Sequence, residues 1–186
     1  PPVKLDTKEA ESFLNSMKAD NETKKLLLAL IASRKIPVNM FVEETYRHQP
    51  VADGAVRRLA KQIHPASIRT LVLLAEAEYF AGGKDRFSHE DFLLPADSYP
   101  VSEWLLSRAR SLGIDKKKPE YVIQGHEWLA FGFKPGPDIG RLIALSNDLR
   151  DEQAMTSQQI FLAVDGCKHA VEAVQKLQAL LPAHGK

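Results

Sequence analysis

Three basic side chains are the strongest candidates for binding chemistry in this sequence. Arg57, Arg58 and Lys61 stand at positions i, i+1 and i+4 of a predicted helix. Apolar residues from Val56 to Ile63 recur at helical spacing, so this helix should bury one face and leave the cations on the side away from it. Guanidinium and ammonium groups bind phosphate oxygens, and the three residues therefore predict a contact with a nucleic-acid backbone. The alternative is a solvated helical face.

The distribution of charge matters more here than its total. The 186 residues carry a formal net charge of +1, which does not mark a nucleic-acid-binding protein. Residues 24–69, however, hold nine Lys and Arg against three Asp and Glu. Because attraction depends on the local potential, such a basic stripe can hold phosphates on a neutral protein. The composition, 44% hydrophobic and 26% charged, is typical of a globular protein and excludes a disordered tail.

A turn rich in glycine and proline is the second candidate region. Gly132 and Gly136 are expected to take backbone conformations closed to other residues, and Pro137 suits the first turn of the next helix. Gly140 is expected to let another helix approach closely. The pattern predicts a helix-turn-helix corner at Gly132–Pro137.

Three groups at this corner could bind a second phosphate: the Lys134 ammonium, the Arg141 guanidinium and the Gly136 N–H. N–H groups beside a helix N-terminus favour an anion. Asp138 would oppose an anion there, and the alternative is a structural corner between two packed helices. The run Lys116–Lys118 is a weaker basic patch.

No pattern in the sequence points to catalysis or to a metal site. The six histidines show no ligand spacing, and no His-Glu pair is followed by a second His as in a zinc-protease helix. Cys167, beside Lys168 and His169, is read as a structural or surface residue rather than a nucleophile. We therefore predict no catalytic residue, no metal ligand and no cofactor in this chain.

Cysteine content and hydropathy bear on where the protein works. A single cysteine permits no internal disulfide, which fits a reducing cytoplasm. The longest apolar run, Leu26–Ala32, is far shorter than the roughly 18 residues of a membrane helix, so no membrane partner is expected. A start at Pro1-Pro2 without Met indicates a processed or truncated chain.

The spacing of apolar residues predicts an all-α protein of about eight or nine helices. Gly82-Gly83 should end a helix that begins near Pro65, and residues 84–98 read as a loop. A capping box at Thr156–Gln159 should open a last helix reaching about Leu181, with a possible break at Gly166. These elements suggest helical lobes at 1–83 and 99–186, or one continuous domain.

Several of these segments together resemble the C-terminal region of the bacterial tRNA nucleotidyltransferase (CCA-adding enzyme) and poly(A) polymerase family. The resemblance covers roughly residues 24–165 and is most specific from Gly132 to Ile143, which resembles a Gly-x-x-Pro-Gly-Pro-x-Ile-Gly-x-x-Leu pattern, with Ile143 at the place of the final Leu. The other matching segments, in the family's order, are Ala55–Ala60, Leu74–Glu78, Trp104–Ala109, Gly125–Trp128 and Thr156–Gln159. Glu127 and Trp128 depart from the family's usual Asp and Leu, and the chain continues through 170–181, beyond the usual end.

The resemblance implies a helical body and tail that grip the acceptor stem of tRNA. In that family a catalytic head, which precedes this region, adds nucleotides to the tRNA 3′ end. Mg²⁺ and a nucleoside triphosphate would be bound by such a head. Nothing in this chain matches the head or the His-Asp metal-binding domain of some members. The expected partner is therefore tRNA or another structured RNA, and the chain would supply binding without chemistry.

A hypothesis from a different class also fits the sequence. The chain could be a helical protein-interaction module that keeps the fold without RNA binding, as a homo-oligomer or with another protein. The near-neutral total charge and the acidic Asp138 favour it. A free-standing enzyme is disfavoured, because no nucleophile or acid–base pair is visible.

Overall fold

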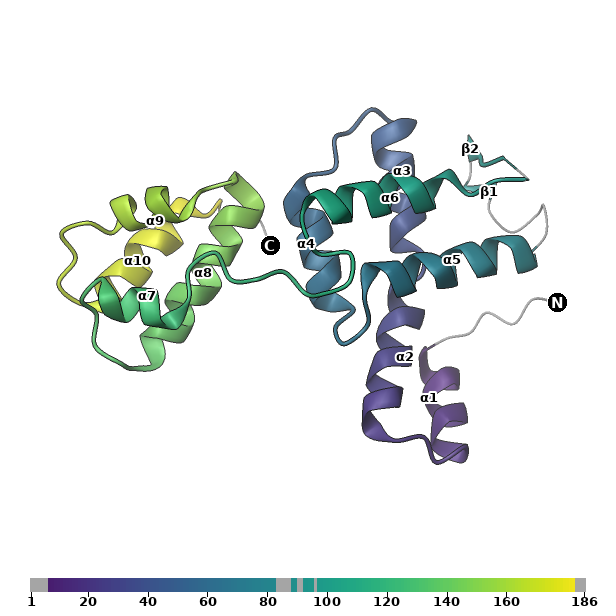
Figure 1. The fold of residues 1–186 in the computed structure, drawn as a ribbon, viewed down its shortest axis with the longest axis horizontal. Helices are drawn as coiled ribbons and strands as arrows, with labels where there is room; N and C mark the ends of the chain where they lie inside the picture. Colours follow the sequence, from purple (N-terminus) through teal and green to yellow (C-terminus); the bar gives the residue numbers. More distant parts are fainter. Residues whose placement is uncertain (1–6, 83–87, 90–91, 96, 183–186) are drawn as a thin grey trace. The chain divides into compact units, whose positions relative to one another are not determined.

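Figure 1 shows the computed structural model, which describes residues 7–82, 88–89, 92–95 and 97–182. The regular structure over these residues is helical apart from two short strands, and the predicted all-α fold class is confirmed. The chain divides into two compact units, Pro1–Pro119 and Glu120–Lys186. In the first unit the elements are α1 (Thr7–Ser16), α2 (Asn21–Ser33), α3 (Ile36–Thr45), α4 (Asp53–Gln62), α5 (Ile68–Gly82), β1 (Ser88–His89), β2 (Phe92–Leu93) and α6 (Pro100–Ser111). The second unit contains α7 (Gly125–Ala130), α8 (Pro137–Gln153), α9 (Ser157–Ala163) and α10 (Ala170–Leu180).

The division between the units differs from the lobes that the sequence suggested. The expected boundary lay within 84–98, but the units meet between Pro119 and Glu120. The reason is the packing of α6, whose Leu105 and Ala109 are fully buried in the same core as residues of α4 and α5. Because α6 shares that core, it belongs with the elements that precede it.

The segment 84–98 is not a loop throughout. Strands β1 and β2 pair antiparallel, with Ser88 opposite Leu93 and His89 opposite Phe92. This pairing satisfies backbone groups that a loop would leave to water. Gly82 is the last residue of α5, as predicted for a helix stop, whereas Gly83–Arg86 lies outside the described residues.

The core of the first unit forms around α4. Val56, Leu59 and Ile63 are at most 2% exposed, so the amphipathic stripe expected from the sequence is confirmed. They pack with residues of α2, α5 and α6 in one cluster. Burial of each Leu or Ile side chain stabilises the fold by roughly 1.5–3 kcal/mol, which holds α4 with its other face outward.

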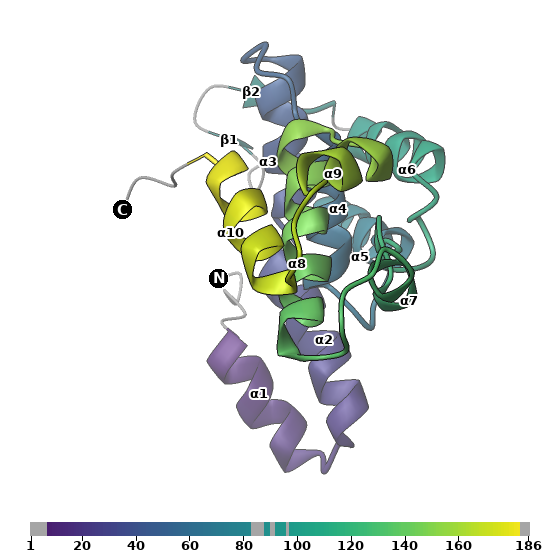
Figure 2. The same ribbon diagram turned by 90° about the vertical axis from the view of Figure 1, so that its left-hand side faces the viewer.

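The core of the second unit is built on Trp128, whose side chain is fully buried. Its ring stacks on Phe133 at 5.9 Å between centroids and meets Phe161 edge-on at 4.9 Å. Helix α10 packs along α8, and the two lie side by side in Figures 1 and 2. Ala173 and Leu177 of α10 are fully buried in this core.

The expected last helix is divided into α9 and α10. The capping box that opens α9 is confirmed: Thr156 and Gln159 exchange bonds between side chain and backbone, at 2.9 and 3.3 Å. Gly166 has φ +77°, a left-handed conformation in which the helical hydrogen bonds end. Gly166 lies between the end of α9 at Ala163 and the start of α10 at Ala170.

The glycines near the predicted corner play different roles from those expected. Gly132 has φ +116°, so glycine suits that position, but Gly136 at φ 172° has an extended backbone that any residue adopts. Gly140 lies on the exposed side of α8, where an added Cβ would meet nothing within 4 Å, so no helix approaches there within the described residues. A close approach occurs instead at Gly125, where a Cβ would lie 3.7 Å from Ile139 and Ile143. The corner itself, between α7 and α8, is as predicted.

Candidate nucleic-acid interface

The three cations of α4 lie on the side of the helix that faces away from its core. Arg58 is exposed, and Arg57 and Lys61 are half-buried. The helix advances about 1.5 Å per residue, so the three groups fall within about 6 Å along its axis. They therefore form one short basic face, which we call the α4 basic face.

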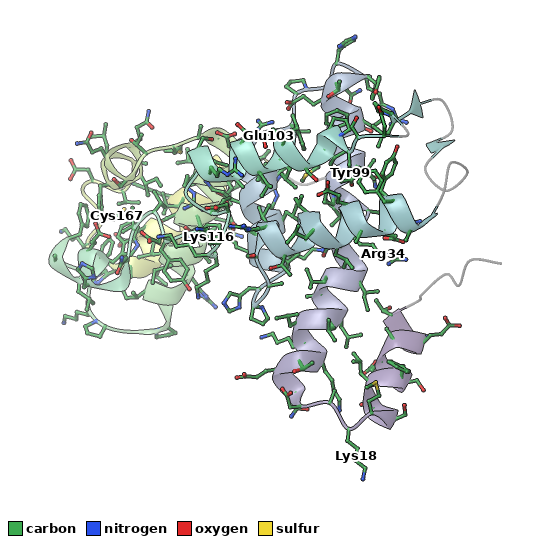
Figure 3. All side chains as sticks on the ribbon, turned by 45° about the vertical axis from the view of Figure 1, so that its right-hand side comes forward. Lys18, Arg34, Tyr99, Glu103, Lys116 and Cys167 are labelled. Carbon is green, nitrogen blue, oxygen red and sulfur yellow. The ribbon has the colours of Figure 1, made fainter. Side chains whose placement is uncertain are left out.

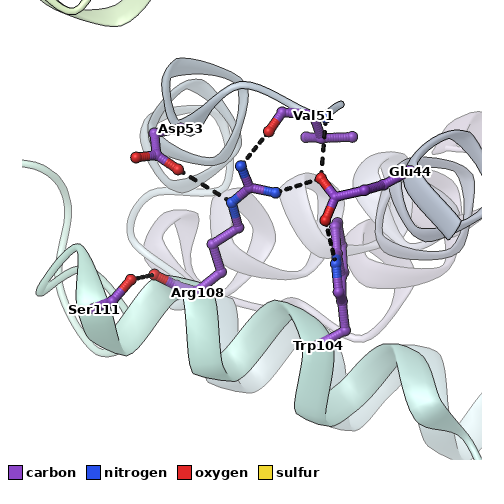
Figure 4. A network of polar contacts seen from close by, with 6 residues as sticks. All are labelled: Glu44, Val51, Asp53, Trp104, Arg108 and Ser111. Atoms are coloured by element: carbon purple, nitrogen blue, oxygen red, sulfur yellow. Dashed lines mark hydrogen bonds and ion pairs between the residues drawn. The ribbon is translucent and has the colours of Figure 1, made fainter. Parts of the chain in front are cut away.

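A polar network fixes the start of α4 (Figure 4). Arg108 of α6 forms ion pairs with Glu44 at 2.6 Å and with Asp53, the first residue of α4, at 3.1 Å. It also donates to the carbonyl oxygen of Val51. The single guanidinium of Arg108 thus connects three segments: the end of α3, the loop before α4 and the first residue of α4. Its planar fork of N–H donors makes these simultaneous contacts possible.

Glu44 is the acceptor at the centre of this network. Its carboxylate accepts hydrogen bonds from Trp104 Nε1 at 2.9 Å and from the Val51 N–H at 3.0 Å, besides the Arg108 pair. Burial raises the pKa of Glu44, but the hydrogen bonds from Trp104 and Arg108 outweigh burial and hold the pKa below its ordinary value. The carboxylate therefore stays charged and acts as a structural anchor rather than a proton donor.

Sequence reasoning missed this network. Trp104 and Arg108 were noted only as part of a matching segment, and Glu44 was not singled out. The one available signal was the i, i+4 spacing of Trp104 and Arg108 on a helix, which places both side chains on the same face. Nothing in the sequence shows that Glu44, 60 residues before Trp104, lies opposite that face.

The run Lys116–Lys118 follows a contact with the start of α5. The Arg69 N–H donates to the Asp115 carbonyl at 3.1 Å, and Ile114 packs in the same core as Ile63 at the end of α4. All three lysines are exposed, and Figure 3 labels Lys116 on the segment after α6. The structure thus brings this weaker patch close to the start of α5.

The remaining predicted residues lie in the second unit. Lys134 and Gly136 line a hollow beside the turn 132–138, and Lys168 and His169 line the same hollow from the segment before α10. Arg141 is not on this lining: its guanidinium pairs with Asp138 at 3.2 Å. The six predicted residues therefore fall into two groups, one in each compact unit.

We next consider metal ligands, the cysteine and membrane-spanning helices among the described residues. Among the residues that the structure describes, no group of three or more His, Cys, Asp or Glu side chains gathers as a metal site would. Cys167 is half-buried. In the described part of the chain, every helix is too short or too polar to cross a membrane.

No protein-family model, curated protein or solved structure matches this chain. The resemblance to the tRNA nucleotidyltransferase family therefore stays a prediction, carried by the segments quoted above.

Proposed function

We propose that this chain is an RNA-binding helical region of a tRNA nucleotidyltransferase-like protein, working in the cytoplasm. The observation that carries the proposal is the α4 basic face: three cations within about one helical turn, opposite a fully buried apolar stripe. The expected ligand is the acceptor stem of tRNA or another folded RNA.

The chemistry of duplex RNA suits such a face. Its deep, narrow major groove keeps side chains from the bases, so proteins recognise it by shape and by phosphate and 2′-hydroxyl contacts. Arg and Lys are sufficient for such contacts. Because the buried stripe and the Arg108 network both hold α4, its backbone loses little conformational freedom when RNA binds, which favours affinity.

Nucleotide addition is not assigned to these residues. In the proposed arrangement the chain holds the RNA, and a catalytic head of the same protein would bind Mg²⁺ and the nucleoside triphosphate. Lys116–Lys118, exposed directly after the contact of Asp115 with the start of α5, would extend the contact along the RNA backbone.

The proposal is tested by measuring tRNA affinity across a series of salt concentrations. We expect affinity to fall steeply with salt, because cations released from the RNA drive binding. Arg58→Ala should weaken binding and lower the slope of log K against log salt by about one, the value for one lost phosphate contact. Lys8→Ala, which removes an exposed cation of α1 outside the basic stretch 24–69, is the matched control and should leave the slope nearly unchanged. Absence of tRNA binding at low salt would overturn the proposal.

The protein-interaction alternative is favoured by a separate observation. Phe13 of α1 and Met17 just after it are 62% and 64% exposed and stand one helical turn apart. Such apolar side chains can pack against a partner helix. If a Phe13→Ser/Met17→Ser variant loses a protein partner from nuclease-treated lysate while the unchanged chain binds no tRNA, the interaction module is the better function.

A further inference from the structure

We propose that the hollow between the turn 132–138 and the start of α10 binds a phosphate group of the RNA, with Lys134 and Lys168 as its cations. This inference rests on the proposed RNA-binding function. It adds a second contact, in the second compact unit, to the contact expected of the α4 basic face.

The hollow is made by tertiary packing. Its lining comes from two segments that lie 30 residues apart in the sequence, at 132–138 and 168–171. They meet because Ala173 and Leu177 of α10 are buried against α8, which begins at Pro137 within the turn. The break at Gly166 lets the chain return to this point. Without α10 the turn would carry only Lys134.

The side chains around the hollow leave an excess of positive charge. Lys134, Lys168 and His169 are exposed on its lining. The carboxylate on the lining, Asp138, pairs with Arg141 at 3.2 Å, and that cation offsets it. Glu172, one turn into α10, is bound to the Lys168 N–H at 3.0 Å. These carboxylates oppose an anion, so the two ammonium groups must supply the attraction.

The hollow is also open at the backbone. A Cβ added at Gly132 or Gly136 would meet nothing within 4 Å, so a phosphate has room to approach the chain there. Gly136 has an extended backbone and does not need to be glycine for conformational reasons. A larger side chain at Gly136 therefore adds bulk at the lining of the hollow without backbone strain and provides a test that changes space instead of charge.

The experiment uses the full chain and an RNA hairpin with a 12-base-pair stem, prepared with either a 5′-hydroxyl or a 5′-phosphate. The charge variants are Lys134→Ala and Lys168→Ala, with Lys176→Ala on the exposed side of α10 as the control. The space variant is Gly136→Val, with Gly140→Val as its control, since Gly140 also faces open space but is not on the lining. Circular dichroism melting checks that each variant remains folded.

We expect Lys134→Ala and Lys168→Ala each to lower the slope of log K against log salt by about one. The control Lys176→Ala should leave this slope nearly unchanged. Gly136→Val should weaken binding several-fold while Gly140→Val has no effect. If the hollow variants lose affinity for both hairpins, the hollow binds a phosphodiester of the RNA backbone. If they lose affinity for the 5′-phosphorylated hairpin alone, the hollow binds a terminal phosphate. Either result supports a phosphate site.

Two results would overturn the inference, and they are distinguishable. If the unchanged chain binds RNA and Arg58→Ala weakens it, but the hollow variants match their controls, the hollow is not a phosphate site and the proposed function stands. If the unchanged chain binds neither hairpin nor tRNA, both proposals are wrong.

Discussion

The two compact units present positive charge in different ways. In the first unit, one helix carries Arg57, Arg58 and Lys61, and a buried stripe on the same helix turns them outward. In the second unit, Lys134 and Lys168 come from separate segments that meet only through the packing of α10. A basic face on a single helix can therefore be found from sequence spacing, whereas a basic hollow between segments depends on the fold. The predictions that follow test this difference, beginning with the largest expected effect.

Removal of the central ring of the second unit should affect that unit most. Trp128→Ala empties a fully buried position and should lower the free energy of unfolding of the second unit by about 3–5 kcal/mol. The hollow should be lost with it, while the α4 basic face keeps its packing. Hydrogen exchange followed residue by residue measures the protection of the second unit and of α4. If α4 loses as much protection as the second unit does, the two units do not unfold separately.

Loss of Arg108 should destabilise the first unit by a smaller amount. Arg108→Ala leaves Glu44 and the Val51 carbonyl without their cation, at a cost of about 1–3 kcal/mol, since the pair is partly exposed. Urea unfolding measures it.

Arg108→Lys provides the matched variant, because it keeps the charge but not the planar fork. It should weaken RNA binding by misplacing α4 and leave the salt slope unchanged. A fall in slope equal to that of Arg58→Ala would mean that Arg108 itself contacts a phosphate.

The capping box of α9 gives a local effect confined to the second unit. Thr156→Ala removes the side-chain oxygen that accepts from the Gln159 N–H and should cost about 1 kcal/mol. Thr156→Ser keeps that oxygen and should cost much less. Thermal unfolding checks both, and equal costs for the two variants would show that the hydroxyl is not responsible.

The smallest expected effect is a loss of stability of the first unit at acid pH. The pKa of Glu44 is lower in the folded chain, so its contribution to stability is complete above its ordinary pKa, about 4.5, and is lost as pH falls through the lower folded value. Glu44→Gln should therefore flatten the decline of stability between neutral and strongly acid pH. Urea unfolding at a series of pH values measures this, and an unchanged decline would assign it to other carboxyl groups.

The helical fold and the orientation of α4 could be predicted because they depend on local patterns. Val56, Leu59 and Ile63 repeat at helical spacing, and their burial follows from that spacing alone. The Thr156–Gln159 cap likewise involves only neighbours in sequence. The boundary within 84–98 differed from the observed division, because it was placed by composition and the burial of Leu105 in α6 could not be seen.

What the sequence alone determined is the set of helices and the outward side of α4, since hydrogen bonds and apolar spacing within a few residues decide both. What only the tertiary structure decided is the meeting of distant groups: Arg108 with Glu44 and Asp53, and Lys168 with Lys134. These pairings arise because many buried apolar contacts, individually weak, together choose which helices pack side by side, and no single residue in the sequence encodes that choice.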